Sequence, residues 1–147
     1  MKAKLTAALV AVFLCLNVSA ETTLKFGGFS HHLSEGDYNS FHRVLILNHN
    51  GYFGGYFKNS YYDDSFTLGY RWHLKTDSLF NFGLSTALVY GYRESSGCYK
   101  KQDKRENDPK RLCFMVSPDA TLYNHKIRPS FALFGADAFT LTFDVGL

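Results

Sequence analysis

The sequence has no apolar run long enough to cross a membrane as an α-helix. Its longest run covers residues 5–16, which is twelve residues, whereas a spanning helix needs about 20. Two lysines precede this run, and Val18-Ser19-Ala20 follows it with the small side chains of a cleavage site. We therefore interpret residues 1–20 as a signal peptide and expect residues 21–147 to form one exported domain.

The chain also has a low net charge and few cysteines. Residues 1–20 carry two lysines and no acid, so the formal charge falls from +3 for the whole chain to +1 for the exported part. We expect no nucleic-acid partner at so weak a charge. Of the three cysteines, only Cys98 and Cys113 lie beyond residue 20. An even pair in an exported chain predicts a disulfide, and closing a loop of this length stabilises by about 3 kcal/mol in the entropic account.

Aromatic residues and a two-residue period are abundant. The chain has 14 Phe and 10 Tyr. In residues 139–147, large apolar side chains hold the odd positions, while Thr, Thr, Asp and Gly hold the even ones, as in a strand with one apolar face. An exported chain that ends on such a strand is typical of outer-membrane β-barrels, which place aromatic rings at both membrane interfaces. A soluble β-sandwich would also alternate, but it would need fewer outward apolar rows.

Eight segments carry a strand pattern. The pattern is cleanest in residues 80–92, where Phe82, Leu84 and Leu88 share one face and small residues share the other. Short connections, among them the hairpin signal Asn50-Gly51, alternate with longer ones, as a barrel requires. We predict an all-β, eight-stranded antiparallel transmembrane β-barrel with strands near residues 22–32, 41–49, 51–58, 65–74, 80–92, 112–123, 126–134 and 139–147.

The interior of such a barrel is too narrow for a water channel, so side chains fill it or one small ligand occupies it. Many residues expected to point inward are small. They either leave room for a hydrocarbon chain or let the strands bend and taper, and both interpretations stay open. Lys25, Arg71 and Arg128 are also expected inside, with Asp119 and Asp144. Because buried charges need partners, we predict an internal ion-pair network.

The loop between the two cysteines is basic. Residues 98–113 contain six cations and three acids. We take Lys100, Lys101 and Arg105 as substrate-binding candidates, because such side chains bind the phosphates of lipopolysaccharide. A solvated loop with no defined partner is the alternative.

Three short motifs resemble a known barrel family. They are Tyr38-Asn39, Lys58-Asn59-Ser60-Tyr61 and Leu68-Gly69-Tyr70-Arg71-Trp72. They are similar to the Tyr-Asn-Glu, Lys-Asp-Ser-Trp and Gly-Tyr-x-Trp stretches of the lipid A palmitoyltransferase (PagP) family, in the same order and at similar spacing. The resemblance covers the first half of the exported chain. It implies eight antiparallel strands, an inner acyl-chain pocket and transfer of a palmitoyl chain from a phospholipid onto lipid A.

The resemblance also implies catalytic residues at the outer rim. The family's Ser matches Ser60, and its Asp matches Asn59, although an amide cannot act as a carboxylate base. His31 or His32 is the candidate for the family's His, but neither stands at the same distance from Tyr38-Asn39.

The rim residues also suggest chemistry without the resemblance. His31 or His32 could serve as the base for a hydroxyl, with Asn39 or Asn59 donating to an oxyanion. A plain polar rim in contact with water is the alternative. A site formed by three histidines lacks metal-ligand spacing, so we expect no metal and no cofactor. The residues grouped at the predicted rim are His31, His32, Tyr38, Asn39, His42, Asn59 and Ser60.

The expected function follows from fold and rim. We expect a monomeric barrel in the outer membrane of a Gram-negative cell, engaging the acyl chains of lipopolysaccharide or phospholipid at the outer leaflet. Whether it is an acyltransferase stays open, with Tyr38 and Asn39 added to the substrate-binding candidates. The alternative is a non-catalytic surface barrel for adhesion, exclusion or membrane stability.

Overall fold

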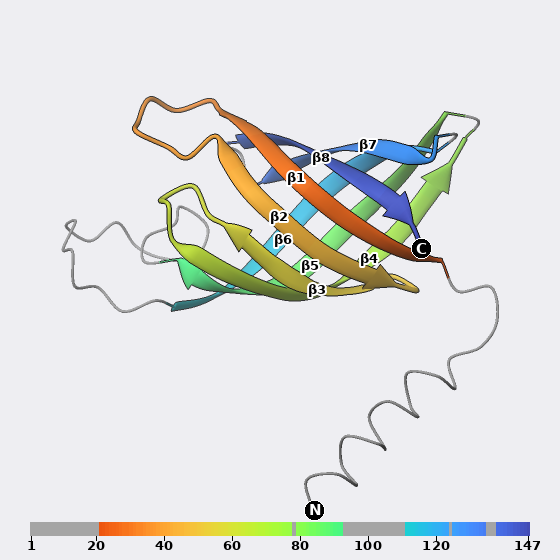
Figure 1. Ribbon diagram of the computed structural model, residues 1–147, viewed down its shortest axis with the longest axis horizontal. Coiled ribbons are helices and arrows are strands. Elements are labelled where there is room, and N and C mark those ends of the chain that lie inside the picture. The colour runs from red at the N-terminus through yellow and green to blue at the C-terminus, as the bar shows by residue number, and fades with distance from the viewer. Residues whose placement is uncertain (1–20, 78, 93–110, 124, 135–137) are drawn as a thin grey trace, which may run out of the picture.

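The computed structural model describes residues 21–77, 79–92, 111–123, 125–134 and 138–147. These residues form eight strands that pair in chain order and close into an antiparallel barrel (Figure 1). Its first and last strands lie side by side. The strands are β1 (Thr22–His32), β2 (Phe41–His49), β3 (Tyr52–Lys58), β4 (Asp64–Thr76), β5 (Phe80–Tyr92), β6 (Arg111–Leu122), β7 (Ile127–Phe134) and β8 (Ala138–Gly146).

The all-β, eight-stranded antiparallel prediction is confirmed. In the described parts of the chain, no helix is long and apolar enough to cross a membrane. Three predicted strands match β1, β2 and β5 at both ends, and the ends of the other five differ from the prediction by at most two residues. The strand predicted to end at residue 74 continues to Thr76, and beyond it the Asp77 carboxylate accepts the N–H groups of Leu79 and Phe80. The Asn50-Gly51 hairpin is confirmed, because both residues have positive φ, as a tight two-residue turn requires.

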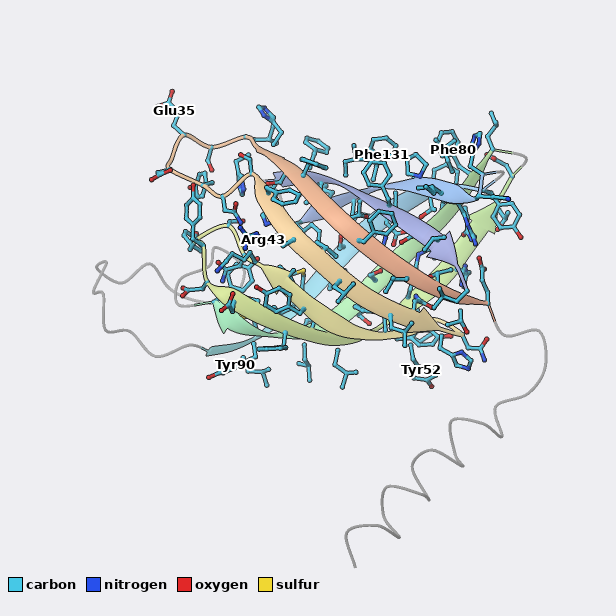
Figure 2. The ribbon with its side chains drawn as sticks, viewed as in Figure 1. Glu35, Arg43, Tyr52, Phe80, Tyr90 and Phe131 are labelled. Atoms are coloured by element: carbon cyan, nitrogen blue, oxygen red, sulfur yellow. The ribbon has the colours of Figure 1, made fainter. Side chains whose placement is uncertain are left out.

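The barrel has two different ends. The loop end carries the connections at residues 33–40 and 59–63, and the turn end carries Asn50-Gly51 together with Glu21 and Leu147. Side chains alternate between wall and interior as the two-residue period predicts. On β5, Asn81, Gly83, Ala87, Val89 and Gly91 are buried, whereas Phe82, Leu88 and Tyr90 are exposed. Figure 2 shows Tyr52, Tyr90 and Phe131 pointing away from the barrel.

The facing of β2 and β3 is weakly marked in the sequence and is settled by packing. Val44 and Ile46 of β2 face the interior, as do Phe53 and Phe57 of β3. Phe57 packs with Ala87 and Val89 as the buried apolar core, in the loop-end half of the barrel. The small interior residues make room for these rings. For example, a Cβ on Gly69 would lie 2.6 Å from the Phe53 ring.

A β-bulge reorients the loop end of β1. The pairing of β1 with both neighbours shifts between Gly27 and Phe29, and Gly27 and Gly28 both have positive φ. A bulge adds one residue to one strand, so the alternation restarts beyond it. Phe29 consequently faces outward beside Phe41, and Ser30 faces the interior beside Thr140.

The seam between β6 and β7 is short. Among the described residues, backbone pairing joins only Asp119, Ala120 and Thr121 to residues 130–132, whereas β5 and β6 pair along most of their length. Pro118 has no N–H to donate. Next to it, the Ser117 hydroxyl donates to the Leu133 carbonyl at 2.9 Å, in place of a backbone ladder.

Candidate functional site

An ionic layer divides the barrel interior into two chambers. Lys25 donates to Ser130, Thr142 and Asp144 at 3.0, 3.2 and 3.2 Å, which uses all three of its N–H donors. On the opposite wall, the Nε of Arg71 donates to the Asp119 carboxylate at 2.8 Å. We call Lys25, Arg71, Asp119 and Asp144 the ionic layer. It confirms the predicted internal ion-pair network.

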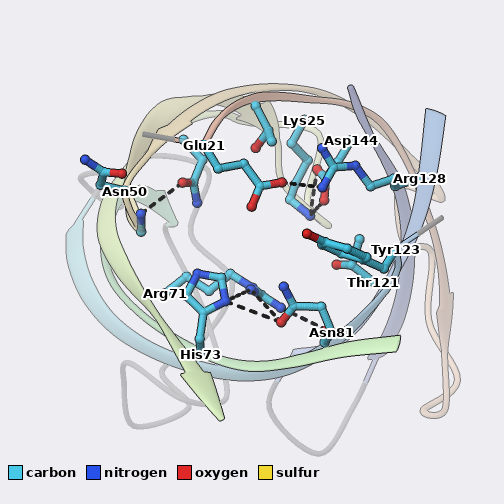
Figure 3. A pocket seen from close by; sticks show the side chains of 13 residues that line it. Glu21, Lys25, Asn50, Arg71, His73, Asn81, Thr121, Tyr123, Arg128 and Asp144 are labelled. Atoms are coloured by element: carbon cyan, nitrogen blue, oxygen red, sulfur yellow. Dashed lines mark hydrogen bonds and ion pairs between the residues drawn. The ribbon is translucent and has the colours of Figure 1, made fainter. Parts of the chain in front are cut away.

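The turn-end chamber is polar. It is a cavity of about 320 Å³ (Figure 3). Arg71 also bonds the ring of His73 and the carbonyl of Asn81 here, at 3.0 and 3.1 Å. Arg128 pairs with Glu21, an acid outside the predicted network. Charges of both signs meet and pair in this chamber, so its lining does not select one kind of ion.

The loop-end chamber is largely apolar. It is a cavity of about 140 Å³ on the other side of the ionic layer. An apolar cavity of similar size, roughly 150 Å³, stays dry and binds small hydrocarbons in another protein. Polar groups gather toward the loop end, where Ser30, His42 and Ser60 line the cavity. Its apolar walls come from Val44, Ile46, Phe53, Phe57, Ala87, Val89 and Met115.

The most organised polar group at this cavity is a chain of two contacts that joins Lys58, His42 and Ser30. The ring of His42 is buried. Its Nδ1 lies 2.7 Å from the Lys58 carbonyl, and its Nε2 lies 2.6 Å from the Ser30 hydroxyl. Because a carbonyl oxygen can only accept, we assign a proton to Nδ1. In the neutral ring, Nε2 then accepts the hydrogen of Ser30. This is the arrangement of a hydroxyl with a general base.

A second histidine contacts the same hydroxyl. The Nε2 of His32 lies 3.3 Å from the Ser30 oxygen. The ring of His32 stacks on Tyr38 at a centroid distance of 4.3 Å, and Tyr38 meets Tyr61 edge to face. Of the two predicted bases, only His32 therefore reaches the interior. His31 is exposed and pairs with Phe139 on the outer face.

Both predicted oxyanion donors hold backbone in place. The amide of Asn59 is fully buried and donates to the Ser65 hydroxyl and the Gly91 carbonyl, both at 3.1 Å. Its oxygen accepts the N–H groups of Tyr61 and Asp63. Asn39 donates to the Asn59 carbonyl and accepts the N–H of Phe41. These hydrogen bonds give both amides a structural role in the loop end, which explains their presence without a role in catalysis.

Ser60 lies beside this group without joining it. Its carbonyl accepts the N–H of Asn39 at 2.8 Å, and the residue lines the loop-end cavity. Among the described residues, the histidines bond to Ser30 rather than to Ser60. Ser30 was not among the predicted site residues, and His42 was predicted at the rim without a partner. The signal that could have found them is Gly27-Gly28 inside a strand, which is typical of a bulge.

The remaining predicted residues are described only in part. Cys113 faces the interior and is 2% exposed, while its predicted partner Cys98 lies outside the described residues, as do Lys100, Lys101 and Arg105. The disulfide and the phosphate contacts therefore stay predictions. Within the described ranges, no group of three or more His, Cys, Asp or Glu side chains could hold a metal ion.

Comparison with known proteins does not extend these observations. No protein-family model matches the chain, and no curated protein matches it.

Proposed function

We propose that this protein spans the outer membrane as a monomer and binds an acyl chain of a phospholipid or of lipopolysaccharide in its loop-end chamber. The observation that carries the proposal is the apolar cavity of about 140 Å³ between the ionic layer and the polar group of Ser30, His42 and Ser60. The ionic layer gives this cavity a floor, so a chain would enter from the loop end or the adjoining wall. The loop end would then face the outer leaflet.

The outer surface supports a membrane location. Every strand exposes at least one large apolar side chain, and Leu68, near the middle of β4, is 68% exposed. A soluble monomer rarely exposes a contiguous apolar patch above about 300–600 Å². A lipid-facing barrel needs a continuous apolar band. The signal peptide predicted for residues 1–20 agrees with this location, and the Cys98–Cys113 disulfide would suit an oxidising compartment.

The short seam between β6 and β7 suggests how a chain could reach the chamber. Only three residue pairs join these strands among the described residues. Within the part of the chain that the structure describes, fewer residue pairs would have to separate at this seam than at any other. A lipid in the surrounding leaflet could insert one acyl chain sideways at this point while its head group stays at the loop end.

Native mass spectrometry of the purified protein in detergent with added phosphatidylethanolamine tests acyl-chain binding. We expect one retained lipid per barrel. Ala87→Phe should abolish the adduct, because Ala87 lines the cavity. Leu88→Phe is the matched control, because its side chain lies on the outer face. A wild-type barrel without the adduct, or equal adducts in both variants, would contradict the proposal. Resistance to unfolding on an unheated gel verifies that each variant is folded.

The second candidate function is a non-catalytic surface barrel for adhesion, exclusion or membrane stability. The ionic layer favours this candidate, because its ion pairs fill the middle of the interior with side chains. Absence of a lipid adduct from a correctly folded wild-type barrel would favour it further.

A further inference from the structure

The contacts around Ser30 indicate a chemical role in addition to acyl-chain binding. Its hydroxyl lies 2.6 Å from Nε2 of His42, and both residues line the apolar cavity. We propose that Ser30 is a nucleophile, with His42 as its general base, toward the carboxylic ester of a lipid whose acyl chain occupies the loop-end chamber. The inference rests on the proposed function, because the chamber supplies the binding energy that holds the ester beside Ser30.

The structure orients the base for this role. The Lys58 carbonyl holds the proton of His42 on Nδ1 at 2.7 Å, so Nε2 of the neutral ring points its lone pair at Ser30. A backbone carbonyl thus does what a carboxylate does in the familiar serine triads, namely fix the tautomer and the ring orientation. The arrangement explains how a base can work here although Asn59 is an amide.

His32 orients the nucleophile from the other side. The Ser30 oxygen lies 2.6 Å from Nε2 of His42 and 3.4 Å from the Asn39 carbonyl, and we assign its one hydrogen to the shorter contact. The contact of 3.3 Å between His32 and Ser30 then requires the Nε2–H of His32 to donate to the Ser30 oxygen. Stacking on Tyr38 holds this ring in place. His32 is therefore a positioning residue, since it acts on the ester only through Ser30.

The reaction balances with two reactants, namely the donor lipid and either water or the hydroxyl of an acceptor lipid. The Ser30 oxygen attacks the ester carbonyl carbon, and Nε2 of His42 takes its proton. The carbon–oxygen bond to the glycerol or sugar oxygen then breaks, and that oxygen receives the proton from His42. The acyl group is left as an ester on Ser30. Water, or the hydroxyl of an acceptor lipid, next attacks this ester while His42 takes the proton of the attacking group. The bond between the acyl carbon and the Ser30 oxygen then breaks, and His42 passes that proton to the Ser30 oxygen, which restores both residues.

An alkyl fluorophosphonate tests the nucleophile directly, because it reacts with activated serine hydroxyls. We expect the folded protein to carry one adduct, mapped by peptide mass spectrometry to Ser30. His42→Gln should slow labelling at least about 100-fold, since general-base assistance contributes roughly 10²–10⁴-fold. Ser40→Ala, an exposed serine outside the cavity, should label at the wild-type rate.

Three outcomes would overturn the inference: no adduct on the folded wild type, an adduct on Ser60 instead, or equal rates for wild type and His42→Gln. Each outcome is measured with the wild-type protein or with His42→Gln. The test therefore needs no substitution of Ser30, which could itself prevent folding. If the barrel retains phosphatidylethanolamine but is not labelled by the fluorophosphonate, the role of Ser30 as a nucleophile is refuted and acyl-chain binding is not. Loss of both lipid and labelling would refute the proposed function as well.

Discussion

Single buried polar groups hold the loop end of this barrel together. Asn59 is the clearest case, because its amide makes four hydrogen bonds and is 0% exposed. Two of these bonds close the loop between β3 and β4, and a third reaches the Gly91 carbonyl on β5. The backbone carbonyl of the same residue accepts from Asn39. One side chain therefore connects three segments, and its two ends are not interchangeable, because the nitrogen must donate and the oxygen must accept.

Asn59→Asp should consequently destabilise the fold. A carboxylate cannot donate to Gly91, so two acceptors would face each other in a buried place. Leaving such a group unsatisfied costs roughly 1–3 kcal/mol, and more when it is charged. Urea unfolding of the barrel in lipid vesicles measures the change. Asn50→Asp, at an exposed turn position with positive φ, is the control and should stay within about 0.5 kcal/mol. An Asn59→Asp barrel as stable as wild type would contradict the role described for this amide.

The bulge on β1 decides which side chains reach the loop-end chamber. Side chains alternate with a period of two, so one extra residue exchanges the faces of everything beyond it. Without the bulge, Phe29 would fill the cavity and Ser30 would point outward. Gly28 permits the bulge for two reasons: its φ is +102°, and a Cβ there would lie 2.5 Å from Val44.

Gly28→Ala should therefore destabilise the barrel and weaken fluorophosphonate labelling together. An alanine at this φ costs roughly 1–3 kcal/mol, and relief of the contact would shift β1 relative to β2. Gly54→Ala is the matched control, because its Cβ would meet only ordinary contacts, the nearest at 3.4 Å. Unfolding in urea gives the free energy for both variants. Equal stability of the two would show that the bulge tolerates a side chain.

The whole barrel presents an apolar outer wall around a charged middle and two unlike chambers. Many of its large apolar side chains are exposed on the outer wall, and only a small apolar core lies inside. The ionic layer is stable in such a setting because Lys25 and Arg71 each have a carboxylate partner and further hydrogen bonds. A buried pair of this kind contributes less to stability than to a fixed geometry, here the floor of the apolar chamber.

The substitution Leu68→Arg distinguishes a barrel that lies in a membrane from one that lies in water. In a bilayer, a cation at this outward position should cost about 2–4 kcal/mol near the midplane. On a water-exposed wall the same change should stay within about 0.5 kcal/mol. Leu33→Arg, 58% exposed in the connection between β1 and β2, should be neutral in both cases. Unfolding in vesicles and fractionation of cell membranes give the two readouts. A neutral Leu68→Arg in vesicles would argue against the outer-membrane proposal.

The sequence by itself determined the number of strands, their approximate ends and the facing of β4, β7, β8 and of β5 as far as Tyr90. These features are local, because an apolar side chain at every second position commits a strand to one face. The alternation of Phe82, Leu84 and Leu88 with small residues is one example. Simple alternation also assigns Tyr92 to the outer face, and this is wrong, because the register shifts between Tyr90 and Tyr92 and Tyr92 lines the loop-end cavity. The ion pairs across the interior were also predictable, because charges in otherwise inward-facing positions must find partners.

Only the tertiary structure decided how the interior is divided and which hydroxyl meets a base. Ser30, His42 and Lys58 lie on three different strands, so their contact depends on register and closure rather than on any local pattern. The bulge at Gly27-Gly28 reverses the facing that simple alternation assigns to Ser30. Likewise, Phe53 turns inward because Gly69 on the neighbouring strand leaves space for its ring. Space between strands is set by all of them together once the barrel is closed, and no single segment encodes it.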